Sequence, residues 1–300
     1  MITLSVKDLK KRIGKKEIIK GIDIELYEGE VFGFLGPNGA GKTTTIRMLT
    51  GLIRPTSGSI SICGYDLQTD FTKAMMHLGC IVENPELYPF LSGYDNLVHF
   101  ARMIPGFRNE RLREVIDLVG LSERIHDKVK TYSLGMRQRL GIAQALLGKP
   151  KVLILDEPTN GLDPAGIREM RQFIRELAKN EGLSVLVSSH LLSEIQLLCD
   201  RVAIISKGAV IQTDTVQALL SSQERMIWRV EPFQQAKEIL GTFTEVQEAE
   251  DSLITEFDSD KAGLWSRELV NSGVRIIEMN RRLPALEDLF LELTGGDRIE

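Results

Sequence analysis

The chain has no run of apolar residues near the roughly 18 that a membrane-spanning helix needs. It has only three cysteines, Cys63, Cys80 and Cys199, too far apart to form a CxxC unit, and we expect them to be reduced and buried. It also lacks a strong charge of either sign, because 37 basic and 42 acidic residues leave a formal net charge of −5. We therefore expect a chain that does not cross a membrane by itself and has no nucleic-acid partner.

The remaining composition is that of an ordinary globular protein. Of the 300 residues, 43% are hydrophobic and 26% are charged, and a chain of this length typically forms about two domains. The first residues lack the basic-then-apolar order of a signal peptide. Together with the few cysteines, this predicts a cytoplasmic location.

Residues 1–218 alternate short β-branched runs with helical patterns, which predicts an α/β domain with a parallel sheet covered by helices. Within it, residues 88–147 are expected to form a helical insertion, with helices over 95–104, 109–120 and the segment after YSLGM. Several strand candidates are almost continuously apolar, as in strands buried on both faces. The candidate strands are 22–26, 31–35, 79–82, 152–155, 184–188 and 202–205.

Residues 219–300 show a different pattern, in which strands and helices follow the order β-α-β-β-α-β-α. This order predicts a small α+β domain of the ferredoxin-like kind.

The segment GPNGAGKTT follows an apolar strand and precedes a helical pattern, and it matches the phosphate-binding motif GxxxxGK[ST] in its required context. Its glycines let backbone N–H groups surround phosphate oxygens, and the helix N-terminus adds a positive dipole end. Lys42 is expected to reach the β- and γ-phosphates and Thr43 to bind Mg²⁺. The predicted nucleotide-binding residues are Gly36, Pro37, Asn38, Gly39, Ala40, Gly41, Lys42, Thr43 and Thr44.

A second motif, KVLILDEPTNGLDP, supports the first. Asp156 ends an apolar strand, at the sheet edge where α/β proteins bind ligands, and it is expected to hold Mg²⁺ through water. Glu157 is expected to accept a proton from an attacking water. The two motifs together predict hydrolysis of a nucleoside triphosphate.

Over residues 2–220 the sequence resembles the nucleotide-binding subunits of ABC transporters. The resemblance adds the signature TYSLGMRQRLGIAQALL, the D-loop NGLDP and the segment VSSHLLSEIQLLCD, in the family's order and spacing. It implies that Ser133 and Gly135 contact ATP bound to an opposite subunit, that Asp163 is the D-loop carboxylate, and that His190 is the catalytic switch histidine. It also implies a dimer, of two copies or with a related ATPase, that two ATP molecules hold together.

Three positions depart from the family pattern. The signature reads YSLGM rather than LSGGQ, with Leu134 and Met136 replacing a glycine and a glutamine. The Q-loop has Glu83 where the family has glutamine, as in the peptide-immunity branch, and we expect Glu83 to sense Mg²⁺–ATP through a metal-bound water. The adenine-stacking position is Ile13 rather than an aromatic residue, so we expect weaker preference for adenine.

Short segments, including ENPELYP and SLGM, resemble exporter ATPases that act on bacitracin and lantibiotics. We therefore predict an ATPase that powers an exporter of peptide, antibiotic or other hydrophobic compound, bound to the inner face of the membrane by separate permease subunits. The aromatic residues Tyr88, Phe90, Tyr94 and Phe100 either pack in the helical insertion or receive a helix of that permease. The alternatives are an ABC-type ATPase acting on the ribosome or DNA and, more remotely, a small-molecule kinase.

Overall fold

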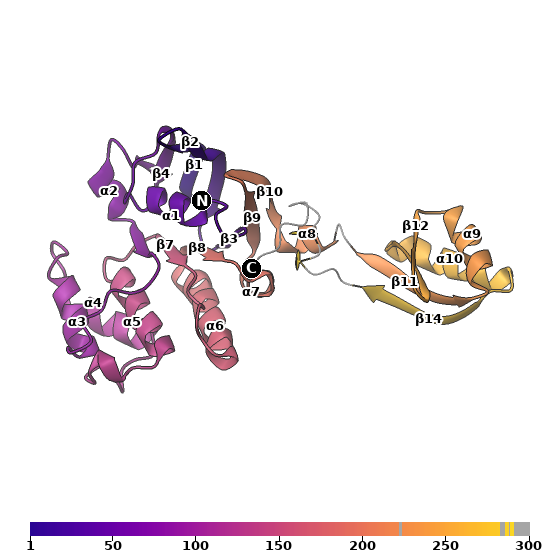
Figure 1. The fold of residues 1–300 in the computed structure, drawn as a ribbon. Coiled ribbons are helices and arrows are strands. Elements are labelled where there is room, and N and C mark those ends of the chain that lie inside the picture. The colour runs from indigo at the N-terminus through magenta and orange to yellow at the C-terminus, as the bar shows by residue number, and fades with distance from the viewer. Residues whose placement is uncertain (222–223, 283–285, 288, 291–300) are drawn as a thin grey trace. The chain divides into compact units, whose positions relative to one another are not determined.

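The computed structural model describes residues 1–221, 224–282, 286–287 and 289–290. The chain divides into two units, the first spanning Met1–Thr215 and the second beginning at Val216 (Figure 1). Each unit has its own hydrophobic core. The last helix of the predicted order β-α-β-β-α-β-α, over residues 285–294, lies mostly outside the described residues.

The first unit is built on a six-stranded sheet of order β10-β9-β3-β8-β7-β6, parallel except for the edge strand β10. The parallel strands follow the apolar runs of the sequence closely, which confirms the predicted α/β class. Strands β3, β7 and β8 are buried along their whole length. The strands are β3 (Val31–Leu35), β6 (Leu78–Ile81), β7 (Val152–Asp156), β8 (Ser184–Ser189), β9 (Arg201–Ser206) and β10 (Ala209–Thr215).

A second, antiparallel sheet has the order β2-β1-β4-β5. Residues 22–26, expected in the parallel sheet, belong to this one, so that part of the prediction was wrong. Its side chains and those of the parallel sheet enclose helix α1 (Lys42–Leu49) in one core, and short helix α2 (Phe71–Met75) follows the sheet. The strands are β1 (Ile2–Ile13), β2 (Lys16–Tyr27), β4 (Ser57–Ile62) and β5 (Tyr65–Asp66).

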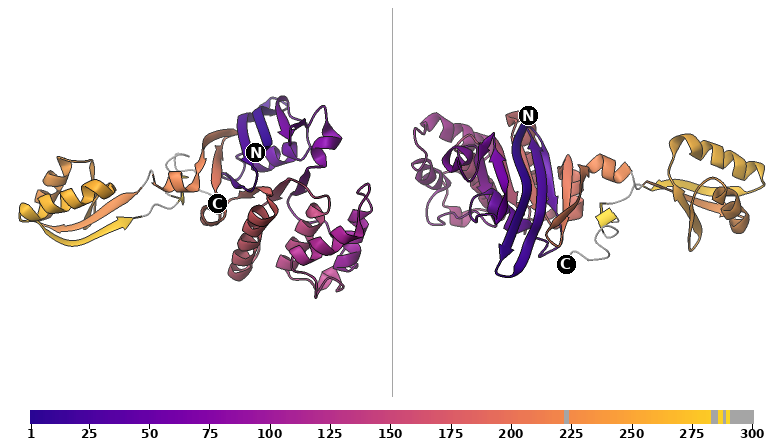
Figure 2. Two further views of the ribbon diagram at one scale, coloured as in Figure 1. Left: turned by 180° about the vertical axis from the view of Figure 1, so that it is seen from behind. Right: turned by 90° about the horizontal axis from the view of Figure 1, so that it is seen from above.

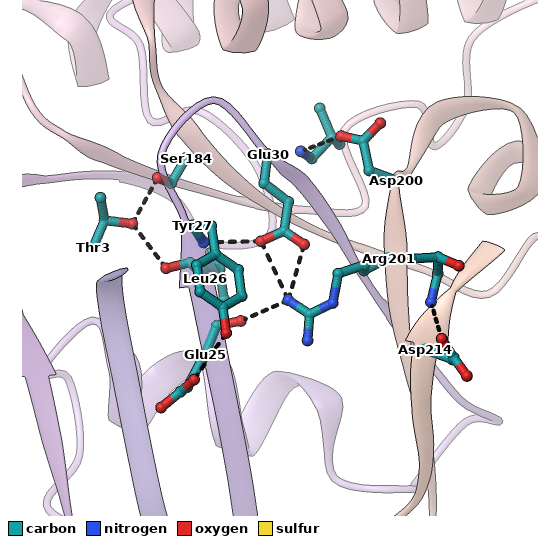
Figure 3. Close-up of polar contacts among 11 residues, drawn as sticks. Thr3, Glu25, Leu26, Tyr27, Glu30, Ser184, Asp200, Arg201 and Asp214 are labelled. Carbon is teal, nitrogen blue, oxygen red and sulfur yellow. Dashed lines mark hydrogen bonds and ion pairs between the residues drawn. The ribbon is translucent and has the colours of Figure 1, made fainter. Parts of the chain in front are cut away.

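Polar contacts join the two sheets (Figure 3). Arg201 of β9 donates to Glu30 at 3.0 Å, and Glu30 accepts the backbone N–H of Tyr27 at 2.8 Å. The Arg201 guanidinium also lies over the Tyr27 ring, 5.1 Å from its centroid. A second contact joins β1 to β8, where the Thr3 hydroxyl donates to Ser184 Oγ at 2.6 Å. Because Glu30 is buried, pairing with Arg201 satisfies a charge that would otherwise destabilise the core.

The helical insertion is confirmed, with helices α3 (Gly93–Ala101), α4 (Asn109–Leu118) and α5 (Leu134–Leu146) and the short η1 (Val129–Thr131). Helices α6 (Pro164–Glu181) and α7 (Leu192–Leu198) follow β7 and β8 (Figure 1). Helix α6 begins where Asp163 accepts the N–H of Gly166 and ends at Gly182, whose φ is 64°. The longest described helix has 18 residues, and none is apolar enough over such a length to span a bilayer.

The second unit starts with helix α8 (Val216–Ser221) and continues as β-α-β-β-α-β. Its sheet has the order β12-β13-β11-β14, all antiparallel, which is the strand order of a ferredoxin-like unit. Figure 2 shows this unit, coloured orange to yellow, from two further sides. Trp228 is fully buried on one sheet face among residues of both helices, including Leu240 and Trp265. The elements are β11 (Arg225–Glu231), α9 (Phe233–Gly241), β12 (Val246–Ala249), β13 (Ser252–Glu256), α10 (Ser259–Asn271) and β14 (Arg275–Arg282).

Candidate active site

The phosphate-binding segment forms a tight loop between β3 and α1. Gly41 caps α1 with a φ of 113°, a conformation that side chains other than glycine rarely adopt. A Cβ atom at Gly36 would lie 2.4 Å from the carbonyl oxygen of Ile205 on β9. The backbone therefore has the shape of a cradle that glycine alone permits, at the positive end of an eight-residue helix.

Lys42 lies inside this cradle with only 6% of its surface exposed. Its ammonium donates to the carbonyl oxygens of Gly36 at 2.6 Å and Pro37 at 3.3 Å. Burial lowers the pKa of Lys42, while the nearby carboxylates of Glu157 and Asp156 oppose that effect. A buried ammonium group that donates to carbonyl oxygens can donate to phosphate oxygens in the same way when a nucleotide binds.

Asp156 ends strand β7 directly opposite Ser188 of β8 in the parallel ladder. The Ser188 hydroxyl donates to the Asp156 carboxylate. Burial raises the pKa of Asp156, although the Ser188 hydrogen bond acts in the opposite direction. Thr43, the first hydroxyl after Lys42, is half-buried at the start of α1. The carboxylate of Asp156 and the hydroxyl of Thr43 are oxygen donors of the kind that Mg²⁺ prefers.

Among the described residues, no three His, Cys, Asp or Glu side chains are grouped so that they could hold a metal unaided. Mg²⁺ in nucleotide sites commonly has one or two protein carboxylates, with water and phosphate oxygens completing its shell. The buried carboxylate of Asp156, next to the phosphate-binding lysine, fits that mode of binding.

Glu157 has its backbone in the left-handed region, with a φ of 50°. Its N–H donates to the carbonyl oxygen and the hydroxyl of Ser188, at 3.2 and 3.1 Å. Its carboxylate oxygen Oε2 lies 2.9 Å from Nδ1 of His190. Backbone strain of this kind is concentrated at functional sites. The structure thus brings together the two residues predicted to be catalytic.

Ser188 was missed by the sequence analysis. Its hydroxyl donates to the Asp156 carboxylate and accepts the backbone N–H of Glu157, so it positions the first side chain and the backbone of the second residue. The serines before His190 were visible in the sequence. Their role depends on the alignment of β7 with β8, which no local pattern reveals.

Ser133 caps helix α5, and its Oγ accepts the N–H of Met136 at 3.2 Å. With Gly135 it lines a groove of about 500 Å³ whose other side is formed by residues 161–170, including Asp163. No residue of the segment 36–44 lines this groove. The predicted signature and D-loop residues are therefore together, but in a cavity that does not include the phosphate-binding loop.

Glu83 and Ile13, two of the departures from the family pattern, lie in different environments. Glu83 has a φ of 66°, and its carboxylate is 2.5 Å from Nη2 of Arg47 on α1. Ile13 ends strand β1 with 58% of its surface exposed.

Comparison with known proteins identifies the family. The family model described as "ABC transporter" matches residues 19–160. An uncharacterized ABC transporter ATP-binding protein of Bacillus subtilis, YhcH, is 49% identical over 298 residues, which cover 99% of this chain and 97% of the relative. The chain belongs to the ABC transporter ATP-binding proteins. It is an ATPase that binds ATP and powers an ABC transporter, as predicted.

Other ABC transporter ATP-binding proteins are also similar. The bacitracin transport ATP-binding protein BcrA of Bacillus licheniformis is 38% identical, with 97% of each chain covered. The lantibiotic transport ATP-binding protein SrtF of Streptococcus pyogenes is 43% identical over 69% of this chain and 89% of its own. The structure of cbiO1 from Clostridium perfringens, part of an ABC transporter complex, has a TM-score of 0.68 at 26% identity, covering 80% of this chain and 96% of that one. These relatives favour transport over the ribosome- or DNA-associated alternative.

Proposed function

We propose that this ABC transporter ATP-binding protein drives export of a peptide antibiotic or another hydrophobic compound, on the cytoplasmic side of the membrane, through separate permease subunits. The cargo class is supported by BcrA and SrtF, which are transport ATP-binding proteins for bacitracin and a lantibiotic. The observation that carries the enzymatic part is the Glu157–His190 contact of 2.9 Å beside the buried Lys42 and Asp156.

In this proposal each site residue has a distinct role in ATP hydrolysis. Lys42 and the backbone of residues 36–44 bind the phosphates. Glu157 accepts the proton of the attacking water, and His190 orients its carboxylate. Mg²⁺, which would be held by the Thr43 hydroxyl and through water by Asp156 and Glu83, would neutralise charge on the β- and γ-phosphates.

The same proposal requires a second nucleotide-binding subunit, either a second copy or a related ATPase. Ser133 and Gly135 lie at the N-terminus of the 13-residue helix α5, where backbone N–H groups favour an anion. Their groove contains no phosphate-binding residue of its own chain. The groove is separate from the phosphate-binding loop of the same chain because, in this proposal, Ser133 and Gly135 bind the γ-phosphate of ATP held by the opposite subunit. Asp163 would then lie at the same subunit interface.

The exposed aromatic residues support docking of a permease. Phe90 is 65% exposed and Tyr88 is 41% exposed, so neither packs in the core of the helical insertion. The buried side chain of Asn96 accepts the Tyr88 N–H at 2.8 Å and donates to its carbonyl oxygen at 3.1 Å. These bonds fix the loop that presents both rings, immediately after Glu83.

Co-expression with candidate multi-span permease subunits tests this function. In a bacitracin-sensitive host, the pair should raise the inhibitory concentration of bacitracin or a lantibiotic, and Lys42→Ala should abolish the effect. Phe90→Ser should also abolish resistance while basal ATPase activity is retained, whereas the matched exposed Phe243→Ser should not. Unchanged susceptibility to both classes of peptide, with an assembled and ATP-hydrolysing complex, would contradict a peptide-antibiotic cargo.

A further inference from the structure

One buried hydrogen bond joins the segments that carry Glu157 and His190. The hydroxyl of Thr159, two residues after Glu157, donates to Oε2 of Glu194, four residues after His190. Both residues are more than nine-tenths buried. The two segments therefore meet twice, once through the catalytic pair and once through this contact behind it.

The other carboxylate oxygen of Glu194, Oε1, is buried and accepts no hydrogen bond from any described residue. An unsatisfied buried carboxylate oxygen opposes folding, because the oxygen loses its hydration and gains no partner. An apolar residue would suit such a position better for stability alone. This loss of folding free energy indicates that Glu194 serves to hold Thr159 rather than to stabilise the fold.

Glu194 is part of helix α7, which packs closely against strand β3. Its neighbours Ile195 and Cys199 pack against Gly33 of β3 so closely that a Cβ atom there would lie 3.0 Å from each side chain. Strand β3 leads directly into the phosphate-binding loop. Glu194 is thus a fixed acceptor relative to that loop, whereas Thr159 lies in the connection between β7 and α6.

We propose that Glu194 is a positioning residue, which holds the 157–163 segment through Thr159 and thereby keeps the Glu157 carboxylate aligned for proton transfer. This inference rests on the proposed role of Glu157 as the general base. The segment also contains Asp163, whose side chain caps α6. Tethering at Thr159 limits how far Glu157 and the D-loop move together during turnover.

The positioning role predicts a specific pattern in steady-state ATP hydrolysis. Thr159→Val removes the donor while keeping the shape, and should lower kcat about tenfold or more with KM for ATP changed less than about twofold, because misplaced catalytic groups slow chemistry more than binding. Thr159→Ser should restore kcat. The double variant Thr159→Val/Glu194→Leu should lower kcat similarly without lowering Tm, since it removes both partners and leaves no unsatisfied buried polar group at this contact.

Two controls separate the possible failures. Thr242→Val removes a hydroxyl that donates to a local carbonyl oxygen in the second unit, and it should leave kcat unchanged. Glu157→Gln should abolish turnover if Glu157 is the base; if it does not, the proposed function is wrong at this residue. If Glu157→Gln is inactive but Thr159→Val keeps wild-type kcat, or if Thr159→Ser fails to rescue, the positioning role of Glu194 is overturned.

Discussion

His190 and Glu157, which directly follow the neighbouring strands β8 and β7, are joined by a 2.9 Å contact between Nδ1 and Oε2. Each side chain is between a quarter and a third exposed, so the pair is open to a substrate and to water. Because an ionised carboxylate only accepts hydrogen bonds, Nδ1 carries the proton in this contact. The arrangement leaves the second carboxylate oxygen of Glu157 for an attacking water.

Asp156 should destabilise the folded protein at neutral pH. Burial raises its pKa above the value of about 3.9 in an unfolded chain, so the folded state binds a proton more tightly and loses stability as pH rises through this range. Asp156→Asn should therefore raise Tm at pH 7, and this advantage should shrink as pH falls toward 4. Thermal unfolding of both proteins across pH measures it; an advantage that is constant with pH would contradict the effect of burial.

Ile13 should give the site little preference for adenine. A residue at the end of β1 with 58% exposure offers apolar contact but no aromatic ring. Stacking of a base on an aromatic ring contributes about 1–3 kcal/mol, so Ile13→Tyr should tighten ATP binding about fivefold or more.

Equilibrium binding of ATP and GTP to both forms tests this expectation. The natural chain should bind the two nucleotides with comparable affinity. Ile2→Tyr, at the other end of the same strand, should have no effect. Strong selectivity for ATP in the natural chain would show that another residue recognises adenine.

Glu83 should affect Mg²⁺ dependence but not stability. Its ion pair with Arg47 is half-exposed on both sides, and such pairs contribute at most about 1 kcal/mol. Glu83→Ala should raise the Mg²⁺ concentration for half-maximal ATPase activity severalfold with Tm changed by no more than a few degrees. Glu86→Ala, at a nearby exposed glutamate, is the matched control. An unaltered Mg²⁺ titration would remove Glu83 from the metal site.

The parts of the fold that were predictable are those with strong local patterns. Strands β3, β7 and β8 were recognised because burial on both faces makes them continuously apolar. Strands β1 and β2 were poorly recognised because charged residues interrupt their alternation and β1 pairs with β4, about 50 residues away. The motif residues were predicted by spacing, whereas Ser188, Thr159 and Glu194 act through tertiary contacts that spacing does not encode.

In the proposed dimer, two subunits share their ATP sites, and Glu157 is the base for hydrolysis of the nucleotide that holds them together. Size-exclusion chromatography of Glu157→Gln with saturating Mg²⁺–ATP tests it most directly. The variant should bind ATP, show no turnover, and elute as a dimer with ATP but as a monomer without it. Adding Lys42→Ala should restore the monomer. A Glu157→Gln protein that binds ATP yet stays monomeric at saturation would contradict the shared site.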